Sequence, residues 1–166
     1  MAQFSIRVYK QYFNFASAHF LLFHDGGREP LHGHNYRVSV EGHAPNLLHD
    51  MVFDFLDIKP IVREVCDEFD HKVILPQENP YLRITEDGQN FQLCTPDESL
   101  FSLPKKDVLL LPISNTSAER LAMLIAQKIQ VKVQQVFSFE FLELKVEVEE
   151  TPGQSAVYLL KKEKSL

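Results

Sequence analysis

Residues 142–150 carry the pattern that most constrains the fold, a strict alternation of apolar and charged side chains, LELKVEVEE. The apolar positions are Leu142, Leu144, Val146 and Val148. Successive side chains of a strand point to opposite faces of a sheet, so one face of this strand is buried and the other is wet. Such strands are typical of an antiparallel sheet covered on one side. Residues 31–44 alternate in the same way, and the turn TPGQ leads into a last strand, SAVYLLKK.

Two stretches change to the helical period, in which apolar residues recur every three or four positions. Within residues 53–70 the apolar side chains are spaced for one face of a helix, and Asp57 is the expected N-cap. Residues 115–129 repeat this pattern, and Thr116 and Glu119 stand at capping-box spacing. Both stretches are therefore predicted to be amphipathic helices.

Two further regions complete the predicted order of elements. Residues 3–20 are rich in aromatic and β-branched side chains and predict one long strand or a bent pair. Residues 77–110 contain prolines and an Asp-Gly turn signal, which indicates an inserted hairpin with strands at 81–86 and 91–94. The whole order predicts one α+β domain over residues 1–166, a four-stranded antiparallel sheet with two helices on one face. Oligomerisation can cover the exposed edges of such a sheet.

The composition and charge argue against several classes of function. The chain has 166 residues, 45% of them hydrophobic, and a formal net charge of -6. That charge argues against nonspecific binding to nucleic acid and to an anionic membrane surface, because both attract basic proteins. No apolar run reaches the length of a membrane span, and the N-terminus lacks a signal-peptide layout. Cys66 and Cys94 make no disulfide framework, so a cytoplasmic protein is expected.

The strand at 31–44 begins with two histidines, His32 and His34, on either side of Gly33. Residues two apart on a strand point to the same side, and the glycine lets another backbone come close. His19 lies near the end of the first strand, and a hairpin can bring it opposite this pair. Three imidazoles with one open position make a zinc site of the catalytic type. The same pattern also fits a polar strand face without a metal, and spacing alone leaves both interpretations open.

Other polar residues also allow a chemical and a structural interpretation. Glu29, three residues before His32, is either a base near a metal-bound substrate or a solvated loop charge. His71 follows Asp70, and an aspartate that orients an imidazole makes a proton relay, although both residues are also common at helix ends. Glu150 is either an outward charge of the sheet or a ligand anchor at its edge.

Together these segments resemble the family of 6-pyruvoyl-tetrahydropterin synthases and 6-carboxytetrahydropterin synthases, over nearly the whole chain. The similarity lies in FASAHF, LHGHNYRVSVEG, MVFDFLDIKPIV, FDHKVILP, NTSAERLA and VEVEETPGQSAVY. HGHN with SAHF upstream and an Asp-His pair downstream is a specific combination. The resemblance implies the tunnelling fold, whose subunits join edge to edge into barrels and stack as hexamers of two trimers.

The resemblance also implies a role for each polar residue. The implied substrate is a small pterin, 7,8-dihydroneopterin triphosphate, and the implied cofactor is zinc (Zn2+). The implied zinc ligands are His19, His32 and His34. The implied residues of the pterin pocket are Glu150, Thr116 and Ser117. Glu150 would bind the N2/N3 edge of the ring with both carboxylate oxygens, and Asp70 with His71 would form the relay for side-chain protons.

One position departs from most of the family. The loop before HGH usually carries a catalytic cysteine, but here it reads HDGGREPL. GREPLHGHNY resembles a variant branch in which glutamate replaces that cysteine. Members of this branch make 6-hydroxymethyl-7,8-dihydropterin for folate synthesis, and some also form 6-pyruvoyl-tetrahydropterin. The resemblance therefore makes Glu29 the expected catalytic base.

The identity of that base bears on the product. A base that takes a hydroxyl proton favours C–C cleavage, and one that takes a C–H proton favours loss of triphosphate and the pyruvoyl product. The alternatives are a 6-carboxytetrahydropterin synthase, an ordinary pyruvoyl synthase and a non-catalytic pterin-binding protein. The basic candidates for the triphosphate are Arg28, Arg37 and Lys72.

Overall fold

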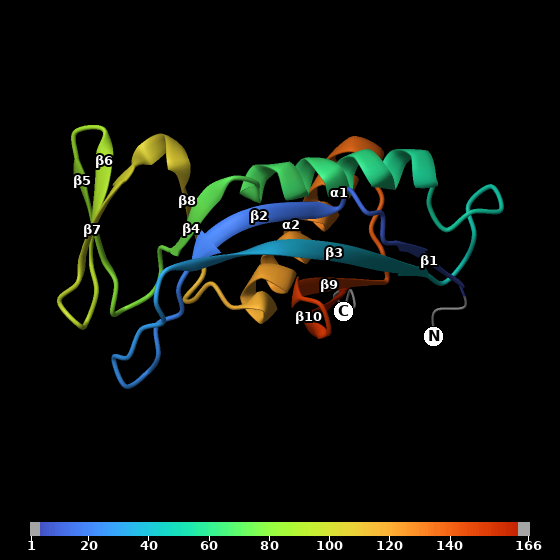
Figure 1. Cartoon of the computed structure of the whole chain (residues 1–166). Helices are drawn as coiled ribbons and strands as arrows, with labels where there is room; N and C mark the ends of the chain where they lie inside the picture. The colour runs from blue at the N-terminus through green and yellow to red at the C-terminus, as the bar shows by residue number, and fades with distance from the viewer. Residues whose placement is uncertain (1–3, 163–166) are drawn as a thin grey trace.

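A curved sheet of seven strands forms the framework of the molecule (Figure 1). The computed structural model describes residues 4–162, so the ends of the predicted domain, 1–3 and 163–166, lie outside the described residues. The strands are β1 (Phe4–Val8), β2 (Asn14–His19), β3 (His32–Ala44), β4 (Lys72–Pro76), β8 (Val108–Leu111), β9 (Glu143–Thr151) and β10 (Gln154–Lys161). Their order is β10-β9-β3-β2-β4-β8, and β1 also pairs with β3.

The alternating strands behave as predicted. β3, β9 and β10 are antiparallel neighbours, and the apolar positions of β3 and β9 are buried while most of the positions between them are more accessible. β1 and β2 pair with successive parts of β3, so the N-terminal region is the bent pair rather than one long strand. A turn closed by a 2.9 Å hydrogen bond from Phe13 N to the Lys10 carbonyl separates them.

The predicted α+β class and its antiparallel strands are confirmed, but the sheet has seven strands rather than four and is not wholly antiparallel. β4 runs parallel to β2, and β8 runs parallel to β4. These short strands have the sequences KVILP and VLLL, without alternation of apolar and polar residues. Parallel strands are buried on both faces and therefore lack that alternation. Without it, the hydrophobic pattern does not distinguish such short strands from other buried segments.

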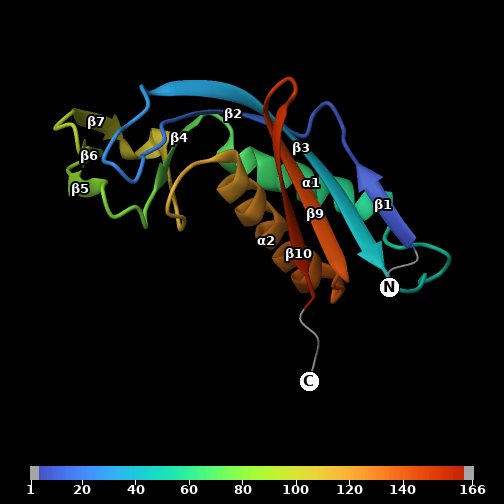
Figure 2. The ribbon, with the colours of Figure 1, turned by 90° about the horizontal axis from the view of Figure 1, so that it is seen from below.

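Both helices lie on the inner side of the curved sheet, as predicted (Figure 2). α1 (Phe55–Phe69) is capped by Asp54, whose carboxylate accepts from Leu56 N at 2.7 Å, and not by Asp57. α2 (Ala118–Phe137) is capped by Ser117, so the predicted capping box of Thr116 and Glu119 is wrong. The true caps lie directly before the first helical residue, where the backbone is still extended.

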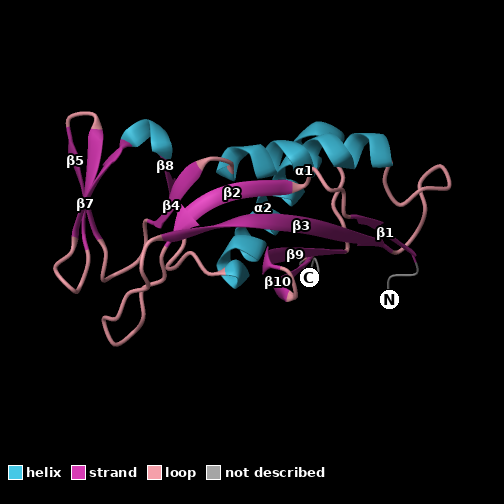
Figure 3. Ribbon diagram, viewed as in Figure 1, coloured by secondary structure: helices cyan, strands magenta, loops and turns pink. Residues whose placement is uncertain are grey.

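The insertion between the parallel strands is a small sheet of its own, at one end of the molecule (Figure 3). Its strands are β5 (Arg83–Asp87), β6 (Asn90–Cys94) and β7 (Leu100–Pro104), followed by the 3-10 turn η1 (Lys105–Asp107). The predicted hairpin corresponds to β5 and β6, and the third strand was not predicted. A second apolar cluster that includes Phe20, Leu75 and Leu93 joins this sheet to the end of β2. Among residues 4–162, no helix is long and apolar enough to cross a membrane.

Candidate metal centre and active site

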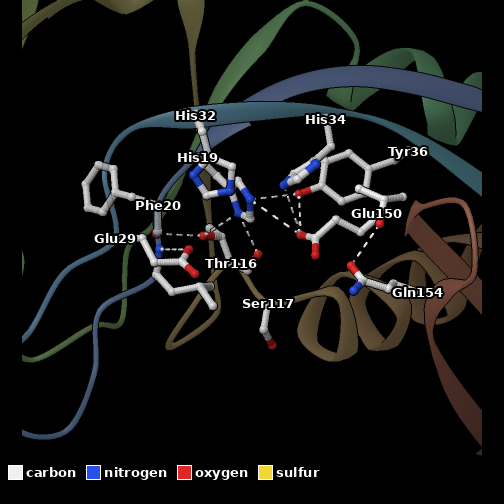
Figure 4. Close-up of polar contacts among 12 residues, drawn as sticks. His19, Phe20, Glu29, His32, His34, Tyr36, Thr116, Ser117, Glu150 and Gln154 are labelled. Carbon is white, nitrogen blue, oxygen red and sulfur yellow. Dashed lines mark hydrogen bonds and ion pairs between the residues drawn. The ribbon is translucent and has the colours of Figure 1, made fainter.

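Strand pairing brings the three histidines together where β2 and β3 meet. His19 lies opposite His32, and His34 lies opposite Ser17. One ring nitrogen from each histidine falls within 4.8 Å of the others, a spacing that can hold a metal ion. Figure 4 shows the three rings side by side. His19 is only 1% exposed, whereas His32 and His34 are half-buried, so the group is accessible from their side.

Gly33 allows the two strands to approach closely between the histidines. A Cβ at Gly33 would lie 3.0 Å from the carbonyl oxygen of Ser17 and 3.5 Å from Ala18 Cα. Both are backbone atoms of the paired strand. The prediction that this glycine lets another backbone come close is confirmed.

Backbone carbonyls fix the orientation of two of the imidazoles. Nδ1 of His19 lies 3.0 Å from the Thr116 carbonyl oxygen, and Nδ1 of His32 lies 2.8 Å from the Pro30 carbonyl oxygen. An Nδ1–H that donates to a carbonyl leaves Nε2 with its lone pair, the form that binds a metal. Burial lowers the pKa of His19 and so favours the neutral ring. The hydrogen bond to the Thr116 carbonyl acts in the opposite direction but does not outweigh burial. The donor set therefore fits a zinc ion.

Glu150 and Tyr36 lie beside the histidines. Oε1 of Glu150 lies 3.5 Å from Nε2 of both His19 and His34, and the Tyr36 hydroxyl donates to the same oxygen at 3.3 Å (Figure 4). Burial and the nearby charge of Glu150 raise the pKa of Tyr36, so the hydroxyl remains a donor. Sequence reasoning missed Tyr36, although it stands two residues after His34 and therefore on the same face of the strand.

Glu29 is held against Leu21, just beyond the end of β2. Its backbone N–H donates to the Leu21 carbonyl at 3.0 Å, and its carboxylate Oε2 accepts from Leu21 N at 3.2 Å. The charge of Glu29 also contributes to the raised pKa of Tyr36. The predicted base and the histidine group therefore share one region of the molecule (Figure 4).

Asp70 and His71 form a close pair on the other side of the sheet. Asp70 accepts from Ala16 N at 2.7 Å through Oδ1 and lies 2.9 Å from His71 Nδ1 through Oδ2. The His71 side chain is 85% exposed, in a shallow pocket with Ala18 and Asn35. Those two side chains alternate with the histidine positions and so point to the opposite face. His34 also lines this pocket, but among residues 4–162 no hydrogen bond or ion pair joins Asp70 or His71 to the histidine group.

Residues 7–161 match the family model described as 6-pyruvoyl tetrahydropterin synthase. The chain belongs to this family. A putative 6-carboxy-5,6,7,8-tetrahydropterin synthase of Methanocaldococcus jannaschii is 35% identical over 147 residues, covering 87% of this chain and 88% of that protein. The resemblance in the sequence motifs is thereby confirmed.

Solved structures confirm the fold of this tetrahydropterin synthase family member. The 6-pyruvoyl tetrahydropterin synthase of Plasmodium vivax has a TM-score of 0.89 and 34% identity, covering 96% of this chain and 98% of that one. The Plasmodium falciparum protein has a TM-score of 0.87 and 30% identity, covering 98% and 100%. A variant of the Plasmodium vivax protein replaces a glutamate, described as a catalytic residue, with alanine.

A cavity of about 310 Å³ adjoins the histidine group of this family member through Glu150, and it is also lined by Leu21, Ser117 and Gln154, among others. Two of the predicted pterin residues, Ser117 and Glu150, therefore share one cavity. The Thr116 hydroxyl is fully buried and donates to the Phe20 carbonyl at 3.1 Å, which places it behind the site rather than on the cavity wall.

The basic candidates for the triphosphate are scattered. Arg37 points to the outer face of the sheet and is 73% exposed. Lys72 Nζ donates to the Lys106 carbonyl at 2.6 Å, next to His71. Arg28 is tied to the inserted sheet by an ion pair with Asp97. The structure does not bring the three together.

Proposed function

We propose that this chain is a zinc-dependent pterin synthase that cleaves the side chain of 7,8-dihydroneopterin triphosphate and releases 6-hydroxymethyl-7,8-dihydropterin for folate synthesis. The observation that carries the proposal is Glu29, held through both its backbone and its carboxylate beside the histidine group. No cysteine occurs in residues 24–31. The glutamate described as catalytic in the Plasmodium vivax protein supports a carboxylate base in this family.

The zinc site would be formed by His19, His32 and His34, whose nitrogens lie within 4.8 Å of one another. A zinc ion bound there supplies Lewis acidity that makes protons of the substrate side chain easier to remove. Thr116 and Pro30 contribute through their carbonyls, which hold two of the rings in the binding orientation.

The pterin ring would lie in the cavity next to Glu150. A carboxylate accepts two parallel hydrogen bonds, which matches the adjacent N–H groups on the N2/N3 edge of a pterin. Ser117 lines the same cavity, and Tyr36 holds one oxygen of Glu150 at 3.3 Å. The ring would displace that carboxylate from its present position between two histidines, which frees the metal centre.

Cleavage requires a base at the C2′ hydroxyl of the substrate. When Glu29 takes this proton, the C2′ oxygen becomes a carbonyl and the C1′–C2′ bond breaks, and its electron pair passes into the C6=N5 bond of the ring. A proton returned to C1′ gives the hydroxymethyl product, and the other fragment leaves as a two-carbon aldehyde that keeps the triphosphate. One proton is taken and one is returned, so the step balances.

The replacement of a thiol by a carboxylate favours this route. A carboxylate with an ordinary pKa of about 4.3 is a weaker base than a thiolate with a pKa of about 8.5. A hydroxyl proton is easier to remove than a C–H proton. A weaker base therefore slows removal of the C–H proton more than removal of the hydroxyl proton.

We propose that Asp70 and His71 serve the site of a neighbouring copy in a hexamer of two trimers. Within one chain the pair faces the other side of the sheet, and His71 is held exposed in a left-handed conformation with φ of 57°. A non-glycine residue with such a φ costs free energy and is found at functional sites. The edge strands β8 and β10 supply unpaired edges through which copies can join.

A second candidate is the synthesis of 6-carboxytetrahydropterin. It is favoured by the name of the Methanocaldococcus jannaschii relative, at 35% identity. It is disfavoured by the absence of the cysteine that most of the family carries before the HGH motif. A purely pterin-binding protein is disfavoured because the histidines, Glu29 and Glu150 are all retained in one region.

The test is incubation of the zinc-loaded protein with 7,8-dihydroneopterin triphosphate and chromatographic separation of the pterin products. The wild type is expected to give mainly the hydroxymethyl product. Glu29→Ala is expected to lower its formation by roughly a hundredfold or more, and Glu29→Cys to shift the products towards the pyruvoyl compound. Glu78→Ala, at an exposed loop position, is the matched control and should behave as wild type. Exclusive pyruvoyl product from the wild type would overturn the proposal.

A further inference from the structure

The residue before the proposed base is bound to the inserted sheet. The Arg28 side chain is 14% exposed. Its Nη2 lies 3.0 Å from Asp97 Oδ2, its Nε lies 3.3 Å from the same oxygen, and Nη2 also reaches Ser99 Oγ at 3.3 Å. Asp97 and Ser99 belong to the turn between β6 and β7, so the insertion closes over the loop that carries the base.

Aromatic rings enclose the same guanidinium. Its carbon lies 5.3 Å from the ring centre of Phe101 in β7 and 5.7 Å from that of Phe20 at the end of β2. The two rings are stacked, with an interplanar angle of 15°. A guanidinium over an aromatic face is attracted by the ring electrons, and more so where water is excluded. Arg28 is thus fixed on one side by the insertion and on the other by the main sheet.

The remaining nitrogen of Arg28 contacts the backbone of the residue that carries the proposed base. Nη1 donates to the backbone carbonyl of Glu29 at 2.9 Å. The backbone of Glu29 is therefore held at its carbonyl by Arg28 and at its N–H by the Leu21 carbonyl. The Glu29 carboxylate accepts a hydrogen bond from Leu21 N. A surface ion pair that only stabilised the insertion would not require this contact.

Hydrogen bonds within the turn orient Asp97 towards Arg28. Asp97 accepts a hydrogen bond from Thr95 Oγ1 and one from Ser99 N at 3.2 Å through Oδ1, which leaves Oδ2 for Arg28. The hydrogen bonds from Thr95 and Arg28 hold the pKa of Asp97 well below its usual range, so it is charged at neutral pH. The charge of Arg28 is thereby matched, and Asp97, Ser99 and Glu29 accept from four of its five N–H groups. These contacts leave little of its hydrogen-bonding capacity for a triphosphate.

We propose that Arg28 is a positioning residue, through which the β5–β7 insertion sets the reach of the Glu29 carboxylate and so the choice of the proton that is removed. This inference rests on the proposed function of Glu29. Displacement of a catalytic group by a fraction of an ångström to an ångström lowers turnover strongly. The insertion would therefore act on the outcome of the reaction without contacting the substrate.

The test compares Arg28→Lys and Asp97→Asn with Glu86→Gln. Arg28→Lys keeps the charge but loses the forked geometry, and Asp97→Asn removes the partner of that fork. Glu86 pairs with Lys105 in the same insertion, and among residues 4–162 no hydrogen bond or ion pair joins it to the loop that carries Glu29, so its variant loses an ion pair of the insertion and serves as the control. Melting temperature and zinc content are measured on each protein. If Arg28→Lys fails to fold, Asp97→Asn still tests the proposal, because Asp97 lies at an exposed turn.

Arg28→Lys and Asp97→Asn are expected to lower kcat roughly tenfold or more, to leave KM within about twofold, and to change the ratio of pterin products, with zinc content unchanged. In a Glu29→Ala background the Arg28→Lys effect should disappear, because residues that act as a unit are non-additive. If both variants match Glu86→Gln while Glu29→Ala is inactive, the positioning role is wrong and the proposed base stands. A raised KM with unchanged kcat would instead make Arg28 a substrate ligand. Full activity of Glu29→Ala would overturn the proposed function itself.

Discussion

Gly33→Ala offers a sharp test of how the strand pairing builds the metal centre. The added methyl group would lie 3.0 Å from the carbonyl oxygen of Ser17, tighter than ordinary van der Waals contact. That carbonyl cannot turn aside, because Ser17 sits in the β2–β3 ladder and its hydroxyl donates to the Phe69 carbonyl at 2.7 Å. Relief requires β2 and β3 to separate by a few tenths of an ångström between His32 and His34.

The size of the effect follows from two opposing contributions. Forcing one methyl group into a packed site costs about 1–3 kcal/mol. Replacing glycine by alanine also stiffens the unfolded chain, which offsets about 0.4–1 kcal/mol. The free energy of unfolding should fall by about 1–2 kcal/mol, or about 2–8 °C in Tm for a chain of this size. Because the displaced backbone carries the ligands, zinc affinity should fall about ten- to a hundredfold, the range seen when the support of a ligand is disturbed.

The assay is urea unfolding together with zinc competition against a chromophoric chelator. Gly42→Ala is the matched control, since its methyl group would clash with the Phe141 ring at the other end of the same strand. It should lower stability without changing zinc affinity. Wild-type stability and wild-type zinc affinity in Gly33→Ala would refute the reasoning.

Three further predictions concern stability and metal binding. Burial raises the pKa of Asp70, but hydrogen bonds from the backbone at Ala16 and from His71 outweigh it and leave the pKa lowered. Its stabilisation is therefore present above about pH 4 and lost as the pH falls through the lowered pKa, so Asp70→Asn should flatten the acid side of the stability curve in urea unfolding. Ser117→Ala should cost about 1 kcal/mol as a lost N-cap and Thr116→Val about 1–3 kcal/mol as a lost buried hydroxyl, and thermal melts showing the reverse order would contradict these roles. Added zinc should raise the Tm, and a zinc-independent Tm would argue against the metal centre.

The sequence was informative where one face of an element is buried and the other is wet. The alternation in β3 and β9 predicted two strands correctly, and the same period placed His32 and His34 on one side. The helices were predicted from their apolar stripes, but their caps were misplaced because Asp54 and Asp57, or Thr116 and Ser117, are equally good capping residues. Only the backbone decides which of them precedes the first turn.

The rest depended on long-range pairing, which local patterns do not encode. β4 and β8 are short apolar runs whose parallel pairing is decided by the main sheet. That pairing puts His71 on the face opposite His19, a relation that no spacing along the chain reveals. Arg28 was one of three basic candidates for the substrate, and its contacts with Asp97 and Phe101 join segments about seventy residues apart.

The fate of the triphosphate tests the central claim most directly. Phosphorus NMR of the zinc-loaded wild-type protein with 7,8-dihydroneopterin triphosphate distinguishes a triphosphate that stays esterified to a carbon fragment from free inorganic triphosphate. C–C cleavage with Glu29 as the base predicts the esterified form, together with 6-hydroxymethyl-7,8-dihydropterin in equal amount. Release of inorganic triphosphate as the sole phosphorus product, with no hydroxymethyl compound, would contradict it.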